Sequence, residues 1–296
     1  ERVIEESVAR AAKSHRQIAE SQVGLDHWKA ERSRLQSRLG EALGLDPLPP
    51  RTPLAARTVG VLERDGYRVE RVVFESRPGF LVTANLYLPD SVSAGGHPAV
   101  LCPGGHWALA KTEPVIQARC IALAKQGFVA LTYDPFGQGE RDVPGNDHYE
   151  YFRSILVGRN NMSFMVWDTI RALDYLCERP EVDPARIACT GASGGGLNTL
   201  YAAAIDKRIA VAVPVVYVTR LKEFLETRHS HCPCSHVNGL ADFADMGDII
   251  ALNAPRPTLL LTASDDTSFT PAGARGAADQ ARTAFELYDA SQALEV

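Results

Sequence analysis

The sequence predicts an α/β fold, with a mostly parallel central sheet and helices on both of its faces. From residue 99 onward, short apolar runs alternate with segments of helical periodicity, and this β-α-β order is typical of parallel strands. Three β-type runs joined by short turns precede that region, which predicts an antiparallel start to the sheet. Residues 1–53 lack this alternation, so we expect them to form an extension whose helices cover one flank of the main domain.

The N-terminal region is expected to be a helical extension followed by a stiff linker. Residues 1 to about 45 are rich in Glu, Arg, Ala and Gln and predict two helices, the second over 25–43. Residues 46–53 contain four prolines and cannot be helical. The predicted division is therefore 1–53 for the extension and linker, and 54–296 for the main domain.

The first strands of the main domain are predicted over 58–64, 67–75 and 81–88. Asp65-Gly66 between the first two is a strong signal for a two-residue hairpin turn. The parallel region follows, with strands expected over 99–102, 128–132, 187–189, 209–216 and 258–262. Helices are expected between and after these strands, over 113–126, 163–179, 197–204 and 273–290.

Two long polar stretches, 135–161 and 217–253, interrupt the alternation and are rich in His, Arg, Gly and aromatic residues. In a parallel sheet, the loops that leave the carboxyl ends of strands build the site. Long insertions at this edge commonly form lids or pocket walls. We therefore expect both stretches to be lid-like insertions.

Composition excludes several classes of function. The net charge of −5 and the absence of a dense Lys/Arg stripe argue against a nucleic-acid-binding protein. The sequence contains no run of 18 or more apolar residues, so no membrane-spanning helix is predicted. The chain starts at Glu1 without an apolar leader, which fits either a removed signal peptide or a start inside a longer protein, so the compartment stays open. Homo-oligomer formation also stays open.

The central motif is Gly191-Ala192-Ser193-Gly194-Gly195, which lies between an apolar strand and a small-residue helix. Strand, G-x-S-x-G and helix is the order of a nucleophile elbow, in which the serine occupies a strained turn. Strand and helix can close around such a turn only if its neighbours are small. We therefore predict that Ser193 is a catalytic nucleophile.

Partners for Ser193 can be placed from the order of the strands. Gly104-Gly105 follows the first parallel strand, and we assign the oxyanion hole to the main-chain amides of His106 and Gly194. His106 could instead be a base, but its backbone is expected to face the substrate. The apolar run 259–263 ends in two aspartates, at the position of the orienting acid. Asp266 is the predicted acid and Asp265 the alternate.

The catalytic histidine is expected on a loop after one further strand. No histidine follows His236, and the chain stops at 291–296, about where that strand would begin. We therefore expect the last strand, its loop and the base to lie beyond Val296. A base among His229, His231 and His236 is the alternative.

The segment 228–236 holds three histidines and two cysteines, which raises the question of a metal. Cys232-x-Cys234 lacks the usual two-to-four-residue step between ligands and a second half-site. We therefore predict no metal and no cofactor, and a turned lid loop instead. Side chains expected to face a substrate pocket are Trp107, Gln138, Arg141, His229, His231 and His236. For Arg141, an ion pair with Glu140 that braces its loop is the favoured role, and contact with the substrate is the sharper hypothesis.

Taken together, the motifs resemble the α/β-hydrolase superfamily, and more narrowly its bacterial acetylxylan-esterase-like and dienelactone-hydrolase-like proteins. The resemblance rests on the segments 76–80, 85–89, 102–107, 134–141, 191–195 and 253–257, and on Asp266. It implies an α/β-hydrolase fold, a Ser-His-Asp mechanism, no metal, and carbohydrate-ester substrates in secreted or periplasmic enzymes. Two departures are Gly104-Gly105, where the family usually has His-Gly, and the missing terminal histidine.

The predicted function is a serine carboxylic-ester hydrolase that acts on a small-molecule or carbohydrate ester, with an acetylated sugar preferred on the resemblance. A prolyl-oligopeptidase-type peptidase shares the elbow, but that group usually carries a large N-terminal propeller. The other alternative is an inactive hydrolase fold used for binding, since fold alone does not decide function.

Overall fold

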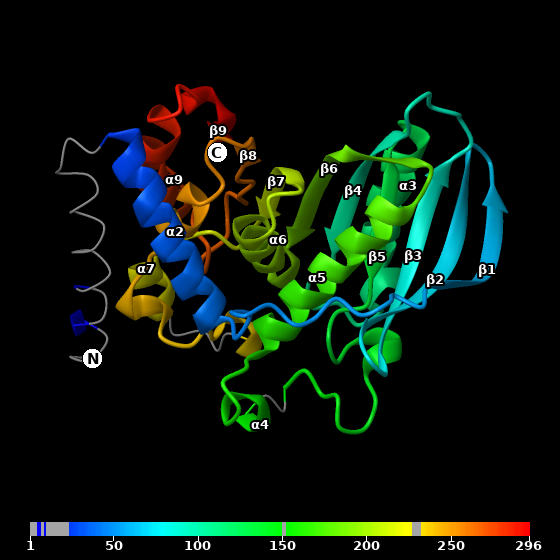
Figure 1. Ribbon diagram of the computed structural model, residues 1–296, viewed down its shortest axis with the longest axis horizontal. Coiled ribbons are helices and arrows are strands. Elements are labelled where there is room, and N and C mark those ends of the chain that lie inside the picture. Colours follow the sequence, from blue (N-terminus) through cyan, green and yellow to red (C-terminus); the bar gives the residue numbers. More distant parts are fainter. Residues whose placement is uncertain (1–4, 7–8, 10–23, 150–151, 227–231) are drawn as a thin grey trace.

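The computed structural model describes residues 5–6, 9, 24–149, 152–226 and 232–296. Within these residues, nine strands form one sheet: β1 (Arg57–Arg64), β2 (Tyr67–Arg77), β3 (Phe80–Pro89), β4 (His97–Pro103), β5 (Val129–Tyr133), β6 (Val182–Ala192), β7 (Ile209–Val215), β8 (Thr258–Leu259) and β9 (Leu294–Glu295). Their order is β1-β2-β3-β5-β4-β6-β7-β8-β9, and Figure 1 shows this sheet crossing the molecule.

The direction of the strands matches the sequence prediction. β1, β2 and β3 pair antiparallel, and β3 also pairs antiparallel with β5. From β5 to β9 every pairing is parallel. The first hairpin turns at Asp65-Gly66, with Arg64 opposite Tyr67. Gly66 has a φ of 83°, a conformation that a two-residue hairpin turn requires and that glycine adopts without strain. The fold is therefore α/β with an antiparallel N-terminal edge.

The helices follow the predicted alternation. The first of the two expected N-terminal helices, before residue 24, lies mostly outside the described residues. The described helices are α2 (Leu25–Ala42), α3 (Pro114–Lys125), α4 (Phe152–Ile155), α5 (Asn161–Glu178), α6 (Gly194–Ile205), α7 (Leu221–Glu226), α8 (Met246–Ala251) and α9 (Pro271–Glu286). Proline begins both α3 and α9, where its missing N–H leaves no helical hydrogen bond unmade.

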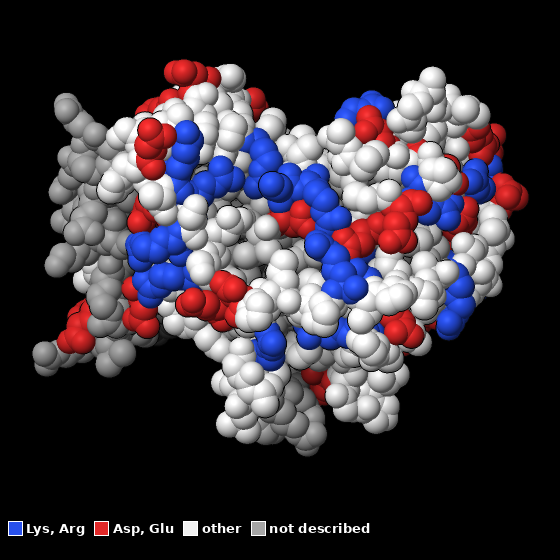
Figure 2. Space-filling view, in the orientation of Figure 1, with Lys and Arg blue, Asp and Glu red and all other residues white. Residues whose placement is uncertain are grey.

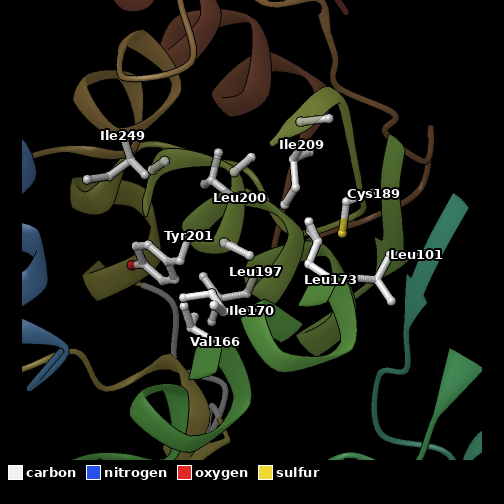
Figure 3. Close-up of a cluster of buried hydrophobic side chains, with 14 of the residues drawn as sticks. Leu101, Val166, Ile170, Leu173, Cys189, Leu197, Leu200, Tyr201, Ile209 and Ile249 are labelled. Atoms are coloured by element: carbon white, nitrogen blue, oxygen red, sulfur yellow. The ribbon is translucent and has the colours of Figure 1, made fainter. Parts of the chain in front are cut away.

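Helices cover both faces of the sheet because side chains alternate along each strand. On β4, Leu101 points into the main core with residues of α5 and α6, part of which Figure 3 shows. Its neighbours Val100 and Cys102 point to the opposite face and pack in a smaller cluster with α3. The central strands are thus buried on both sides, as expected for parallel strands.

Helix α2 packs into the main core of the sheet domain. Its side chains Trp28, Leu35 and Leu39 are buried in the same cluster as the central sheet. Gln36 Nε2 also donates a hydrogen bond of 2.7 Å to the carbonyl of Ala204, at the end of α6. Burying one such apolar side chain contributes about 1.5–3 kcal/mol, so α2 stabilises the sheet domain directly.

The two long insertions differ in structure. Residues 135–161 contain a 3₁₀ helix (Gly139–Arg141) and α4. In the second insertion α7 and two 3₁₀ helices (Pro233–Ser235 and Leu240–Asp242) are followed by α8, whose six residues are all buried. The prediction of a lid over the whole of 217–253 is therefore wrong from residue 246 onward, where apolar side chains such as Ile249 and Ile250 pack in the core.

The last strands require two further corrections. β8 spans two residues and not 258–262, although Leu261 makes an isolated parallel bridge with Val215. β9 pairs in parallel with β8, so the strand expected beyond Val296 already begins at Leu294. Leu260 N donates to the Glu295 carbonyl at 2.9 Å and fixes this register.

On the face seen in Figure 2, a band of basic side chains crosses the molecule with acidic side chains directly beside it. Ion pairs such as Arg208–Asp206 and Arg179–Glu181 join charges of opposite sign among the described residues. A mixed surface of this kind lacks the one-signed field of a nucleic-acid-binding face. Among the described helices, none is both long and apolar enough to span a membrane.

Candidate active site

Ser193 occupies the turn between β6 and α6 and has a φ of 57° and a ψ of −123°. A side-chain-bearing residue adopts this conformation only when the surrounding structure enforces it. The enforcing contacts are close: a Cβ at Gly191 would lie 2.5 Å from the Pro103 carbonyl, and the Ser193 amide donates to the Val215 carbonyl at 3.0 Å. The structure therefore has the geometry predicted for a nucleophile elbow.

The Ser193 side chain is exposed, and its hydroxyl makes no hydrogen bond to another described residue. Burial of the rest of the turn is nearly complete, since Gly191, Gly194 and Gly195 are all buried. The hydroxyl thus projects from a rigid, closed turn towards solvent. This is the arrangement that a nucleophile needs in order to reach an ester carbonyl.

The predicted oxyanion turn lies directly against the elbow. A Cβ at Gly105 would be 2.5 Å from the Ala192 carbonyl and 3.4 Å from Ser193 Cβ, so only glycine allows this approach. Neither the His106 amide nor the Gly194 amide donates a hydrogen bond to a described residue. Two free N–H donors therefore lie in the two segments that meet at Ser193.

The two candidate aspartates follow β8 at the same edge of the sheet. Ala192, Val215 and Leu261 are aligned across consecutive strands, so the loops after residues 192 and 261 leave the same edge of the sheet with one strand, β7, between them. Asp266 is half-buried, and its Oδ1 accepts hydrogen bonds of 2.8 Å from the amides of Ser268 and Phe269. Asp265 is exposed. The fixed carboxylate is thus Asp266, the first choice of the sequence argument.

The loop after β5 is held differently from the prediction, because Glu140 and Arg141 do not pair. Arg141 is buried, and its Nη1 donates to Asp168 Oδ2 at 2.8 Å and to the Asp134 carbonyl at 3.0 Å. Glu140 pairs with the buried Lys111, which also contacts Asp134. Arg141 therefore braces the loop from inside the protein and does not face a substrate pocket.

Other predicted pocket residues lie around a hollow of about 270 Å³ beside the oxyanion turn. It is lined by His106, Trp107, Ala108, Gly137, Gln138, Gly139, Asp142 and Tyr149. Trp107 is 42% exposed, and Gln138 Nε2 is buried without a hydrogen-bond partner among the described residues. His236 is exposed, and His229 and His231 lie outside the described residues. A larger cavity of about 540 Å³ lies against β1–β3 and contains neither Ser193 nor Asp266.

Beside the elbow, four side chains from three segments converge: His106, His148, Cys232 and Cys234. His106 Nε2 lies 2.8 Å from His148 Nε2, and Cys232 Sγ lies 2.8 Å and 2.9 Å from these two nitrogens. Cys234 Sγ lies 3.7 Å from His106 Nε2, and all four ligand atoms lie within 4.8 Å of one another. We refer to these four residues as the His/Cys cluster. The sequence analysis did not single out His148, and it gave His106 a backbone role with a catalytic base as the alternative.

The protonation of the cluster is set by its own members. A hydrogen bond from the Cys234 thiol lowers the pKa of Cys232 to about 2, against the effect of burial and assisted by His106 and His148. The same contact with Cys232, together with burial, raises the pKa of Cys234. Burial disfavours the charged form of His148, but the hydrogen bond and the charge of Cys232 outweigh it and raise the pKa of His148. The pKa values of the two thiols are therefore shifted in opposite directions, and Cys232 is the more acidic.

Comparison with known proteins supplies the family. The model of the prolyl oligopeptidase family matches residues 115–289, which include Ser193 and Asp266. YtaP of Bacillus subtilis, by name a hydrolase, is 30% identical over 257 residues that cover 82% of this chain and 83% of YtaP. Acetyl esterase Axe7A of Xylanibacter ruminicola is 30% identical over 138 residues, or 43% of this chain and 31% of that enzyme.

Among solved structures, methylesterase BT1017 matches with a TM-score of 0.74 and 25% sequence identity. The match covers 96% of this chain and 62% of that chain. The chain thus spans most of YtaP but less than two thirds of both the acetyl esterase and the methylesterase.

Proposed function

The chain belongs to the prolyl oligopeptidase family of α/β-hydrolases, and on that premise we propose that it is a serine carboxylic-ester hydrolase. The proposed reaction is removal of an acetyl group from a carbohydrate through an acyl-enzyme. The observation that carries the proposal is Ser193, exposed at a φ of 57° between two segments with free main-chain amides. Relatives named as an acetyl esterase and a methylesterase support an ester substrate.

In the proposed mechanism, Ser193 Oγ attacks the ester carbonyl carbon while a base accepts its proton. The amides of His106 and Gly194 then donate to the oxygen, on which negative charge develops. Collapse of the tetrahedral intermediate breaks the bond to the alcohol, which leaves with the proton from the base. A water molecule attacks the acyl-enzyme in the same way and releases acetate and free Ser193.

Asp266 is proposed to hold the tautomer and orientation of the base. Its Oδ1 is occupied by two amides, which fixes the carboxylate and leaves Oδ2 as the acceptor for an imidazole N–H. Among the described residues no histidine bonds the Ser193 hydroxyl. We therefore propose that the base lies outside the described residues, after Val296 as predicted, with His229 and His231 as the alternatives.

The substrate is proposed to bind over the hollow beside the oxyanion turn. Trp107 offers an exposed aromatic face of the kind on which sugar rings stack, and Gln138, whose Nε2 is buried without a hydrogen-bond partner among the described residues, lines the same hollow. Trp107 directly follows His106, and Gln138 lies in the loop after β5. An acetylated sugar placed here would lie against His106, whose main-chain amide is one of the two proposed oxyanion donors.

The first experiment is hydrolysis of p-nitrophenyl acetate by this chain and by a C-terminally extended chain, each with its Ser193→Ala variant. We expect serine-dependent turnover, with a loss of about 10⁶-fold in kcat on removal of the nucleophile. Acetate and methanol release from acetylated and methyl-esterified oligosaccharides then assigns the ester. Activity only in the extended chain places the base after Val296, whereas activity in both moves it to residues 1–296.

The acid is tested with a neighbouring pair of variants in whichever form is active. Asp266→Asn should lower kcat by about 10⁴-fold, because an amide cannot hold the imidazole in the required tautomer. Asp265→Asn is the matched control and should retain activity within a few-fold, since this side chain is exposed. Equal losses in both variants, or a larger loss in Asp265→Asn, would contradict the assignment.

A peptidase is the second candidate, because the family description names a peptidase chemistry. Serine-dependent cleavage of a peptide p-nitroanilide without cleavage of acetyl or methyl esters would favour it. Intact-mass detection of an acetylated protein early in the ester reaction separates the two further. Absence of serine-dependent turnover on every substrate would instead support a binding role for the fold.

A further inference from the structure

We propose that the His/Cys cluster is a structural zinc site, formed by His106, His148, Cys232 and Cys234. The sequence argument against a metal considered only Cys232 and Cys234 with their neighbouring histidines. The fold adds one histidine from the oxyanion turn and one from the first insertion. Two cysteines and two histidines are a common ligand set of structural zinc sites.

The distances within the cluster suit a shared cation better than a set of hydrogen bonds. Two imidazole nitrogens and one sulfur lie at mutual distances of 2.8–2.9 Å. Three atoms at the corners of such a triangle cannot all be joined by nearly linear hydrogen bonds. A tetrahedral zinc ion holds neighbouring nitrogen and sulfur ligands about 3.3–3.8 Å apart, so its entry would move the three close atoms apart by less than about 1 Å.

The histidine tautomer fits a metal ligand. His148 Nδ1 lies 2.8 Å from the Phe136 carbonyl, to which it can only donate. In the neutral imidazole this leaves the lone pair on Nε2, the atom that points into the cluster. A carbonyl that accepts from the second ring nitrogen is the usual partner of a zinc-bound histidine.

The position of the His/Cys cluster allows a bound metal to connect three segments of the fold. It ties together the oxyanion turn, the loop after β5 and the segment that contains the 3₁₀ helix Pro233–Ser235. The His106 ring also packs on Gly194, where an added Cβ would lie 2.8 Å from Cε1 and 3.8 Å from Cys234 Sγ. A metal held by four protein ligands has no open coordination position. It would therefore fix the two segments that carry the oxyanion amides and would not act on the substrate itself.

The test measures metal content in protein purified without a histidine tag and without added metal. We expect about one zinc per chain by inductively coupled plasma mass spectrometry, and its loss in Cys234→Ser and His148→Ala. Cys177→Ser and His27→Ala are the matched controls, since these residues lie outside the cluster and should leave the zinc content unchanged. Ser193→Ala should also keep its zinc, which separates this proposal from the catalytic one.

Replacement of the metal by cobalt gives a second readout. Tetrahedral cobalt with two thiolate ligands should produce strong visible absorption and thiolate-to-metal charge-transfer bands, both absent in Cys234→Ser. Removal of the metal by a chelator should lower the Tm, and zinc but not magnesium should restore it. Protein that folds and holds less than about 0.1 metal per chain, together with rapid alkylation of Cys232 that zinc does not slow, would overturn the proposal.

Discussion

Substitution of Gly105 by alanine tests whether contact between the oxyanion turn and the elbow controls the reaction. The new Cβ would lie 2.5 Å from the Ala192 carbonyl, whereas real Cβ atoms stay beyond 3.0 Å. The turn must therefore retreat from the elbow by about half an ångström or more, because the Ala192 carbonyl belongs to the buried end of β6. An oxyanion donor works within about 2.7–3.1 Å of the oxygen, so the His106 amide would move out of range.

Loss of one oxyanion donor costs about 10²–10³-fold in kcat, or roughly 3–4 kcal/mol of transition-state stabilisation. We expect this loss in Gly105→Ala with little change in KM, because the interaction forms only in the transition state. The overpacking should cost about 1–3 kcal/mol of unfolding free energy, which circular dichroism and urea unfolding measure separately.

Gly104→Ala is the matched control. Its added Cβ would have its nearest contact at 3.4 Å, with Pro135 Cγ, which is an ordinary van der Waals distance. This variant should keep kcat within a few-fold, in the form of the protein that shows serine-dependent hydrolysis. A folded Gly105→Ala variant with unchanged kcat, or an equal loss in both variants, would refute the reasoning about the oxyanion turn.

Two further predictions concern stability. Asp168→Asn leaves the buried Arg141 without its charge partner, so the free energy of unfolding in urea should fall by about 3–5 kcal/mol. The control Glu226→Gln removes an exposed ion pair and should change it by less than about 1 kcal/mol; a similar effect in both would contradict this account. Burial raises the pKa of Asp206, but hydrogen bonds from Arg208 outweigh it and lower the pKa below its ordinary value. The unfolded chain therefore takes up this proton first, and the stability that Asp206 adds is present above about pH 4 and lost as the pH falls through the lowered pKa. Urea unfolding between pH 6 and pH 2.5 should show a difference between wild type and Asp206→Asn that shrinks at the acid end, and a difference independent of pH would contradict this.

Structural features that depend on neighbouring residues were predicted well from the sequence. Helix periodicity located α2, α3, α5, α6 and α9. The prediction of a hairpin turn at Asp65-Gly66 was correct, because a two-residue hairpin needs a residue that tolerates positive φ. The elbow followed from glycines at 191, 194 and 195 between a strand and a helix in the sequence, although the contacts that exclude larger side chains there are mainly with Pro103, Gly104 and His106.

Predictions about side chains in the insertions were less accurate, because their partners come from distant segments. Arg141 reaches Asp168 on α5, whereas the sequence offered only the adjacent Glu140. The end of the second insertion was predicted as a lid from its polar composition, yet α8 is buried because its apolar residues meet α6 and α9. The sequence around Arg141 or around α8 does not predict either contact.

The sequence by itself determined the α/β alternation, the direction of the strands and the candidate nucleophile. Each of these can be predicted from a periodicity or a motif within a short stretch of the sequence. Only the tertiary structure decided that α2 packs into the core, and that His106 and His148 meet Cys232 and Cys234. These contacts join residues that are far apart in the sequence, and the folding of the sheet brings them together.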